Sequence, residues 1–434
     1  MIPRLRLRGD AVEIGILLPW AAILCFGLLM LFSVSSPSVG DFAYGARATA
    51  AISRSFFYRQ IFWALLGIGV MWASAMIPFR IYKDYLSWLL YGASMLVLIL
   101  LFVLPPMRGG TQRWLVLGPL SLQPSEFAKA GMILMLASFL AARRGDPDRL
   151  SQVGWVLALV LPPTFLVLKQ PDLGTAITFL WLTVPMLLWR GLSLRRLLIL
   201  AAPLISGAIV LYGETQGTAG FGLVHLLWTL YMAALFVIML LSPRVSLLER
   251  SVFLIAAIAV GLAVPRVWDS LLPYQQKRIL VYFDPGLDPL GAGYQIFQSK
   301  VAIGSGGLVG RGYLQGTQKG LAFLPARHTD FIFSVVGEEF GFLGALCLLG
   351  LYAWLILRGF RLAGKAHSPF AQLLTVGISA YLLFHVFVNV AMTIGLAPVT
   401  GIPLPGMSFG GSVLISTSFL LGLQMNIARN WSRY

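Results

Sequence analysis

The chain contains 434 residues, of which 58% are hydrophobic and 11% are charged, and its mean hydropathy is +0.84. A soluble domain needs far more polar surface than this composition supplies, so that class of protein is excluded. The formal net charge is +16. The basic residues stand in short loops and form no single patch, which argues against nucleic acid as a partner. We therefore expect an all-α, polytopic integral membrane protein.

Uninterrupted apolar stretches of about 17 to 25 residues, long enough to cross the hydrocarbon layer, predict about twelve transmembrane helices. The first is preceded by Arg4, Arg6 and Arg8. The run Ser35-Ser36-Pro37 does not resemble a signal-peptidase site, so we expect this helix to be retained. The predicted helices are centred near Leu24, Leu66, Val97, Leu134, Leu159, Leu180, Ala202, Leu230, Ile258, Leu346, Phe384 and Leu420.

Basic residues recur in every second loop, and this alternation predicts the orientation of the chain. With the N-terminus inside, each inside segment holds at least two Arg or Lys residues, and an even number of spans returns the C-terminus to the same side. Both termini are therefore expected in the cytoplasm. The later inside segments contain Arg80 and Lys83; Arg143, Arg144 and Arg149; Arg190, Arg195 and Arg196; Arg244 and Arg250; Arg358, Arg361 and Lys365; and Arg429 and Arg433.

The outer loops hold most of the remaining polar sequence, in 107–129, 169–174, 274–339 and 398–412. No nucleotide-binding motif occurs, and the His and Cys residues lack the spacing of a metal site. An enzyme that works outside without nucleotides needs a substrate that carries its own activation, and a lipid-linked pyrophosphate is the obvious class. Outer Arg and Lys residues run against the positive-inside trend and could bind its phosphates. For any one of them, a solvated loop facing the lipid headgroups is an equally good interpretation.

The outer segments resemble, in order, the signatures of the shape, elongation, division and sporulation (SEDS) family. The matching blocks extend from about residue 14 to residue 428. The runs at 316–318, 398–405 and 408–411 are similar to the elongation branch of that family rather than its division branch. The blocks are Met107-Arg-Gly-Gly-Thr-Gln-Arg-Trp-Leu115, Gln123-Pro-Ser-Glu-Phe-Ala-Lys129, Lys169-Gln-Pro-Asp-Leu-Gly-Thr175, Asp288-Pro-Leu-Gly-Ala-Gly-Tyr-Gln295, Gln298-Ser-Lys300, Ile303-Gly-Ser-Gly-Gly307, Gly316-Thr-Gln318, His328-Thr-Asp-Phe-Ile332, Pro398-Val-Thr-Gly-Ile-Pro-Leu-Pro405 and Ser408-Phe-Gly-Gly411.

This resemblance implies a peptidoglycan glycosyltransferase that polymerises lipid II, the undecaprenyl-pyrophosphate disaccharide-pentapeptide, at the outer face of the bacterial cytoplasmic membrane during cell elongation. It implies a class B penicillin-binding protein, whose transpeptidase crosslinks the new strands, and the elongation machinery as partners. It assigns no cofactor with certainty, and a divalent cation, Mg²⁺ or Mn²⁺, bridging the pyrophosphate stays open. A lipid II flippase and a non-catalytic scaffold for the penicillin-binding protein remain as alternatives. The internal repeats and paired broken spans typical of a transporter are not detectable.

The chain departs from the family pattern in its number of spans. Members have about ten, and three candidate spans lie between Arg195 and Pro273 where the family has one. We therefore expect a single transmembrane domain over 1–434 that contains an inserted helix pair at about 220–268, followed by a long extracytoplasmic loop at 269–329. A second departure is Ala326, where relatives commonly carry Glu, so no essential role is assigned to that position.

Asp288 occupies the catalytic acidic position of the family, so the resemblance makes it the candidate general base. A pyrophosphate is already a good leaving group, and transfer then needs chiefly a base for the acceptor hydroxyl and cations for the departing phosphates. The expected reaction is a single displacement with inversion. Gly291 and Gly293 allow close approach of the backbone. From the residues alone, an Asp-Pro turn is the better interpretation.

Several other residues are predicted to contact the substrate. Glu126 and Lys129 are three residues apart at the start of a span, so a helix places them on one face. A mutually compensating buried pair is the alternative to a cavity-lining role. Arg108 and Arg113 could bind phosphate, and Trp114 could stack on the substrate or simply anchor at the interface.

Four further positions complete the predicted substrate site. Lys169 and Asp172 flank a proline at an outer helix boundary, where an ion pair and a substrate contact are equally good interpretations. Lys300 belongs to the outer basic set. Ser408 has no base near it in sequence, so we expect it to position backbone or substrate and not to act as a nucleophile. The run His328-Thr-Asp-Phe-Ile332 suggests a base and its orienting group, but a capping or hydrogen-bonding role is preferred.

Overall fold

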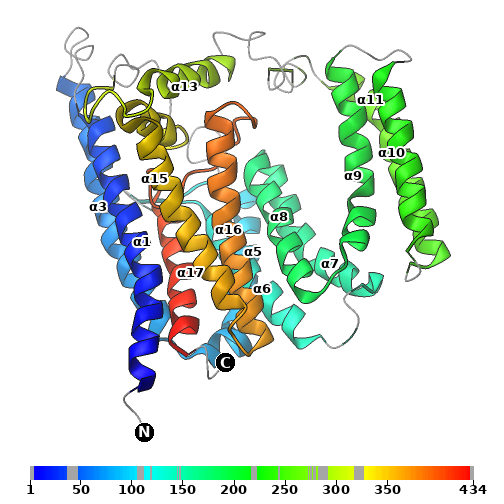
Figure 1. Cartoon of the computed structure of the whole chain (residues 1–434), viewed down its shortest axis with the longest axis horizontal. Coiled ribbons are helices and arrows are strands. Elements are labelled where there is room, and N and C mark those ends of the chain that lie inside the picture. The colour runs from blue at the N-terminus through cyan, green and yellow to red at the C-terminus, as the bar shows by residue number, and fades with distance from the viewer. Residues whose placement is uncertain are drawn as a thin grey trace. The chain divides into compact units, whose positions relative to one another are not determined.

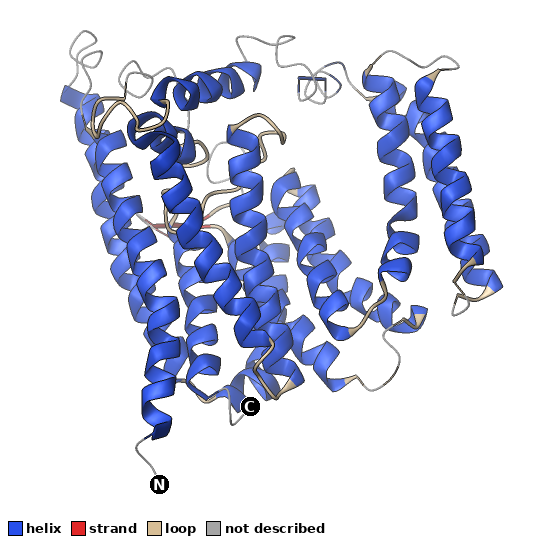
Figure 2. Cartoon of the chain, in the orientation of Figure 1, coloured by secondary structure: helices blue, strands red, loops and turns tan. Residues whose placement is uncertain are grey.

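The structure is a computed structural model that describes residues 4–36, 47–104, 112–117, 120–143, 145, 148–216, 222–242, 245–271, 273, 276, 280–281, 292–316 and 327–430. Helices account for most of the described chain (Figure 2). In order, the elements are α1 (Arg4–Ser35), α3 (Arg47–Met76), α4 (Phe79–Ile81), a π-helical turn η1 (Tyr82–Leu86), α5 (Ser87–Val103), β1 (Leu115–Leu117), β2 (Leu120–Leu122), α6 (Pro124–Ala142), α7 (Leu150–Lys169), α8 (Leu173–Arg190), α9 (Leu194–Thr215), α10 (Leu223–Leu240), α11 (Leu247–Ser270), α13 (Ala292–Gly306), α15 (Ile332–Ala363), α16 (Pro369–Thr393) and α17 (Gly411–Asn430).

Twelve helical segments of the described chain are long and apolar enough to span a membrane. Each of the twelve centres predicted from hydropathy falls within one of them, so the expected number and positions of the spans are confirmed. The molecule is a multi-span membrane protein. The chain divides into two compact units, the first formed by residues 1–145, 154–189 and 295–434 and the second by 146–153 and 190–294. Within the first unit, α1 begins and α17 ends at the same end (Figure 1).

The core of the first unit is built from α6, α16 and α17. In these helices 78%, 78% and 83% of the span residues are buried, against 22% for the span formed by α4 to α5. Both α3 and α1 pack on α17, and α15 packs on α16. The exposed side chains of the outer helices are largely apolar, as expected for a surface that contacts lipid. Polar side chains in α6, α16 and α17 are therefore enclosed by protein.

A short hairpin leads into α6. Strands β1 and β2 pair antiparallel, with Leu115 opposite Leu122, and Pro124 then occupies the first turn of the helix, where a missing N–H has no cost. The backbone N–H of Gln123 donates to Ser412 Oγ at 2.8 Å. The start of α6 is thereby joined to the start of α17.

A sharp break in α15 receives the segment that follows α13. Gly341 has φ of 64°, and a Cβ there would lie 2.3 Å from the backbone nitrogen of Gly310, so only glycine fits. Past this break, the N–H of Phe342 donates to the carbonyl of Gly307 at 2.9 Å. Further back, Ser299 Oγ lies 2.6 Å from Ser334 Oγ. These contacts fasten α13 to α15.

The second unit contains α9, α10 and α11, which share an apolar core. An ion pair joins Arg196 in α9 to Glu249 in α11 at 2.9 Å, and Ser246 and Glu249 form a reciprocal capping box at the start of α11. The predicted inserted pair at 220–268 coincides with α10 and α11, which pack with α9. The core residues are Ile199, Ala202, Leu235, Met239, Val245 and Ala257.

Candidate active site

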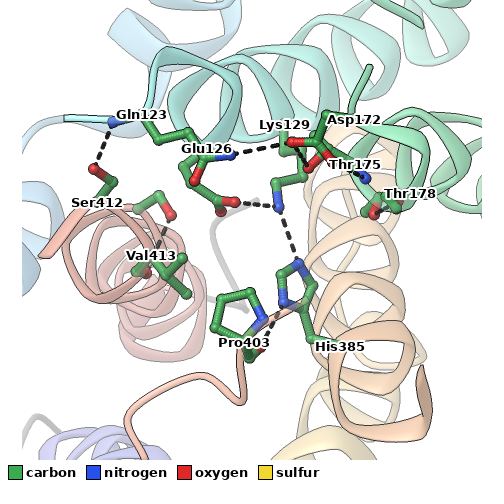
Figure 3. Close-up of polar contacts among 12 residues, drawn as sticks. Gln123, Glu126, Lys129, Asp172, Thr175, Thr178, His385, Pro403, Ser412 and Val413 are labelled. Atoms are coloured by element: carbon green, nitrogen blue, oxygen red, sulfur yellow. Dashed lines mark hydrogen bonds and ion pairs between the residues drawn. The ribbon is translucent and has the colours of Figure 1, made fainter. Parts of the chain in front are cut away.

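A buried lysine lies at the centre of a polar cluster in the first unit (Figure 3). Lys129 Nζ is 2.8 Å from Glu126 Oε1, and the two side chains are 1% and 2% exposed. The same ammonium lies 3.1 Å from Nε2 of His385 on α16. The i,i+3 pair predicted from the sequence is therefore present. An ion pair inside a membrane-embedded bundle is costly enough to suggest that it serves a function.

The cluster continues from His385 to the segment between α16 and α17. His385 Nδ1 is 3.1 Å from the carbonyl oxygen of Pro403, and the ring of Tyr381 packs 4.3 Å from the imidazole. Tyr381 also lies beneath the lysine, with 5.5 Å between Lys129 Nζ and its ring centroid. Three elements far apart in sequence thus meet around one ammonium group.

Asp172 lies beside this cluster and caps α8. Its Oδ1 accepts the backbone N–H of Thr175 at 3.2 Å, its Oδ2 accepts the Thr175 hydroxyl at 3.0 Å, and Gln123 Nε2 donates to the same Oδ2 at 3.2 Å. Lys169 is exposed, and its Nζ lies 4.9 Å above the ring of Phe165. In the part of the chain that the structure describes, Lys169 and Asp172 form no ion pair.

Arg113 holds the turn between α7 and α8. Its Nε donates to the carbonyl of Gln170 at 2.6 Å, and its Nη2 donates to the carbonyl of Pro171. The neighbouring Trp114 is half-buried. The guanidinium therefore links the hairpin before α6 to the 169–174 segment, and a phosphate would have to use its remaining donors or replace these carbonyls.

The 398–410 segment enters the helical bundle although it has no regular structure. His385 precedes the end of α16 by eight residues, which corresponds to a depth of about 12 Å. One helical turn nearer the end of α16, Asn389 donates to the carbonyl of Ile402 at 2.8 Å. Further along the segment, Tyr352 in the middle of α15 donates to the carbonyl of Pro405 at 2.6 Å. Irregular backbone at membrane depth is tolerated only where protein buries it or where it lines a polar cavity.

Ser408 contributes to the order of this segment. Its hydroxyl donates to the carbonyl of Thr329 at 2.6 Å and accepts the N–H of Leu404 at 2.9 Å. Both contacts are with backbone groups, and the positioning role stays a prediction. The contact with Thr329 joins the 398–410 segment to the turn before α15.

That turn carries a histidine and an aspartate with different surroundings. His328 stacks on Phe56 at 4.5 Å, and burial together with Arg327 lowers the pKa of its imidazole. Burial raises the pKa of Asp330 to about 6; a hydrogen bond from Thr329 opposes this shift and the Asp172 carboxylate adds to it. Both residues lie in a turn that precedes α15.

Three predicted positions remain. Asp288 and Arg108 lie outside the described residues. Lys300 is exposed on α13, and its side chain lies so close to Gly395 that a Cβ there would be 2.3 Å from Lys300 Cε. The described residues contain no group of three or more His, Cys, Asp or Glu side chains that could hold a metal ion.

Sequence reasoning missed the contribution of α16. Tyr381, His385 and Asn389 recur at intervals of four residues in an otherwise apolar span, so they share one face of the helix. All three are fully buried. A polar face within an apolar span is itself a signal of a functional interior, and it could have been read from the sequence.

Comparison with known proteins identifies the family. The family model for FtsW, RodA and SpoVE, described as a cell cycle protein, matches residues 15–221 and 222–433. The chain belongs to the SEDS family. Peptidoglycan glycosyltransferase MrdB of Escherichia coli K12 is 37% identical over 407 residues, covering 94% of this chain and 90% of MrdB. Peptidoglycan glycosyltransferase RodA of Treponema pallidum is 33% identical over 447 residues, covering 98% of this SEDS protein and 99% of that RodA.

Solved structures agree with this assignment. A chain from a peptidoglycan synthase complex, described as coordinating polymerization and crosslinking, superposes with a TM-score of 0.69 at 33% identity and covers 97% of this chain and 98% of that one. The rod shape determining protein RodA of Thermus thermophilus gives a TM-score of 0.59 at 28% identity, covering 96% and 97%. The expected fold, a helical SEDS membrane protein, is therefore confirmed.

Proposed function

We propose that this protein, a peptidoglycan glycosyltransferase of the SEDS family, polymerises lipid II at the outer face of the bacterial cytoplasmic membrane during cell elongation. The observation that carries the proposal is the buried Lys129 ammonium, paired with Glu126 and enclosed by α6, α16 and the 398–410 segment. Lys129 lies near the start of α6, at the outer end of that span, so its cation suits a pyrophosphate that enters the bundle from the outer membrane surface. The likeness to proteins named peptidoglycan glycosyltransferase supports the same reaction.

In the proposed mechanism Asp288 removes the proton from the 4-hydroxyl of the acceptor sugar. The freed oxygen attacks the anomeric carbon of the donor, the bond from that carbon to the pyrophosphate breaks, and the α-linked phosphate becomes a β-1,4 glycosidic bond. The bonding electrons leave with the pyrophosphate. Lys129, Arg108 and Arg113 are proposed to stabilise that negative charge, which grows as the bond breaks.

The remaining predicted residues are assigned supporting roles. Trp114 and Lys300 are proposed to contact the lipid-linked sugar or its headgroup. Asp172 and Ser408 would act on the shape of the site, because their described contacts are with protein. Lys169 is exposed and available to an anionic substrate.

A class B penicillin-binding protein and the elongation machinery are the proposed partners. The structural neighbour from a peptidoglycan synthase complex supports the first of these, because its complex is described as joining polymerization to crosslinking. The described chain has twelve candidate spans, and α1 begins at the end of the first unit where α17 ends. We propose that both termini are cytoplasmic, in line with the basic inside loops.

We propose that a divalent cation, Mg²⁺ or Mn²⁺, would bind only together with the substrate. Because the described residues offer no cluster of metal ligands, such an ion would be held mainly by pyrophosphate oxygens. Removing divalent cations with EDTA and restoring each one separately would test this assignment.

The deciding experiment uses purified protein, lipid II and no soluble nucleotide. We expect glycan polymer to form, and to form equally in the presence of a β-lactam and of moenomycin. A flippase would instead move lipid II across vesicles without joining sugars, and a scaffold would do neither. Absence of polymer from folded protein, alone and with the penicillin-binding partner, would refute the proposal.

A further inference from the structure

His385 is a buried histidine with two defined neighbours. Its side chain is fully buried in α16, with Lys129 Nζ 3.1 Å from Nε2 and the Pro403 carbonyl oxygen 3.1 Å from Nδ1. Figure 3 shows the imidazole between these two groups, with Glu126 on the far side of the lysine. The ring therefore bridges α6 and the 398–410 segment.

The chemistry of these neighbours determines which ring nitrogen carries the proton. An ammonium group only donates hydrogen bonds, so Nε2 must present its lone pair to Lys129. A peptide carbonyl only accepts, so Nδ1 must carry the hydrogen that is donated to Pro403. A doubly protonated ring would place two cations 3.1 Å apart and could not accept from the lysine. His385 is thus neutral with the proton on Nδ1.

The His385 imidazole, as a second acceptor beside Glu126, determines how the Lys129 ammonium is oriented. With Glu126 Oε1 at 2.8 Å and His385 Nε2 at 3.1 Å, two of the three ammonium protons have protein partners. Among the described residues the third proton has no hydrogen-bond acceptor, and the Tyr381 ring lies 5.5 Å from Nζ, so this proton is left for an acceptor on the substrate. Without the imidazole lone pair, the ammonium would be drawn towards Glu126 alone, whose charge would then compete more effectively with that of a phosphate.

We propose that His385 is a positioning residue for Lys129. Its Nε2 orients the ammonium so that one N–H is presented to the pyrophosphate of the substrate, and its Nδ1–H links that lysine to the 398–410 segment through Pro403. This role rests on the proposed function, since it assumes a lipid-linked pyrophosphate as the ligand of Lys129.

Two substitutions separate the two nitrogens of the ring. His385→Gln keeps an acceptor near the position of Nε2, whereas His385→Asn keeps a donor near Nδ1 and loses the acceptor. Loss of a hydrogen bond to a charged group typically weakens an interaction by about 10- to 100-fold. We expect His385→Asn to raise the KM for lipid II by about that factor, and His385→Gln to stay within about 3-fold of the unchanged protein.

A double-mutant cycle tests whether the effect passes through Lys129. In a Lys129→Ala background, His385→Asn should have little further effect, because the group it orients is gone. His225→Asn is the matched control: it makes the same change in α10 of the second unit and should leave KM unchanged. Additive effects of His385→Asn and Lys129→Ala, or equal KM values for the Gln and Asn variants, would overturn the assignment.

Binding of undecaprenyl pyrophosphate to the full-length protein distinguishes this inference from the proposed function. If folded protein binds this lipid and His385→Asn weakens binding while His385→Gln does not, the positioning role stands even where no polymer is formed. If the unchanged protein polymerises lipid II but both variants bind the lipid normally, the positioning role is wrong and the proposed function survives. Thermal unfolding of each variant checks that it is folded; if His385→Asn is not, the cycle is run with His385→Gln and His385→Met, and normal binding by His385→Met overturns the role.

Discussion

Asp172 Oδ1 accepts the backbone N–H of Thr175 at 3.2 Å, so the aspartate caps the helix that follows the Lys169-Gln-Pro motif. The same carboxylate accepts Gln123 Nε2 from the end of the hairpin before α6. A residue chosen from its motif as a substrate contact thus has a structural function in the described site. That function has a measurable consequence.

Replacing Asp172 with Ala should lower the free energy of unfolding by about 1 kcal/mol, the usual value of an N-cap. Asp172→Asn should recover most of this loss, because an amide oxygen can accept the Thr175 N–H. Thermal unfolding of both variants in the same detergent measures the difference. Equal destabilisation by Ala and Asn would mean that the charge, and not the cap, carries the contribution.

Asp288→Ala and Asp288→Asn should reduce the rate of polymerisation by roughly 10²- to 10⁴-fold, the range expected for loss of a general base. Binding of lipid II and of the penicillin-binding partner should persist. Lys129→Ala or Arg113→Ala should weaken substrate engagement as well as turnover, because these cations act on phosphates in the ground state too. Single-turnover assays at saturating lipid II separate the effects. Near-normal activity of Asp288→Asn would remove this residue as base and make Glu126 the next carboxylate to test.

The raised pKa of Asp330 predicts a stability that falls as pH rises. Its native pKa of about 6 lies above the ordinary 3.8, so between these values the native state binds more protons than the unfolded state. The contribution of Asp330 to the free energy of unfolding is fully present below about pH 4, and it is lost as the pH rises through about 6. We expect Asp330→Asn to flatten the decline in melting temperature over that window. An unchanged pH profile in this variant would show that other groups cause the decline.

Gly341→Ala should disrupt the junction between α13 and α15. The substitution places a side chain at φ of 64° and brings its Cβ within 2.3 Å of the Gly310 nitrogen, so the backbone on one side must move. Gly350, also in α15, has no neighbour within 4 Å of a built Cβ and is the matched control. We expect a lower melting temperature and lower polymerisation for Gly341→Ala, and near-normal values for Gly350→Ala. Equal behaviour of the two would contradict this account.

Hydropathy was sufficient to predict the twelve spans, because length and apolar composition are local properties of each segment. The Lys129–Glu126 pair was predictable for the same reason, since helical spacing fixes which residues share a face. The polar face of α16 was readable too, but the contact of His385 with Lys129 was not predictable. His385 is 256 residues away from Lys129, and only packing of α6 against α16 brings them together.

Sequence reasoning also assigned Arg113 to phosphate on the basis of its charge and motif. In the structure its guanidinium holds two backbone carbonyls of the neighbouring outer segment. The sequence gives the chemical type of a side chain, but it does not tell which acceptor that side chain will bond in the folded protein. The depth reached by the 398–410 segment was hidden for a related reason, because irregular backbone has no periodicity from which a path could be inferred.

The separate core of α9, α10 and α11 affects how this protein unfolds. A unit with its own apolar interior, ion pair and capping box can lose its structure at a temperature different from that of its neighbour, so a melting curve with two components is expected. Both cysteines, Cys25 and Cys347, belong to the first unit. Both thiols are exposed, so an environment-sensitive fluorophore can be attached to them in the folded protein. Its signal then reports unfolding of the unit that contains Lys129, while the three-helix unit carries no label.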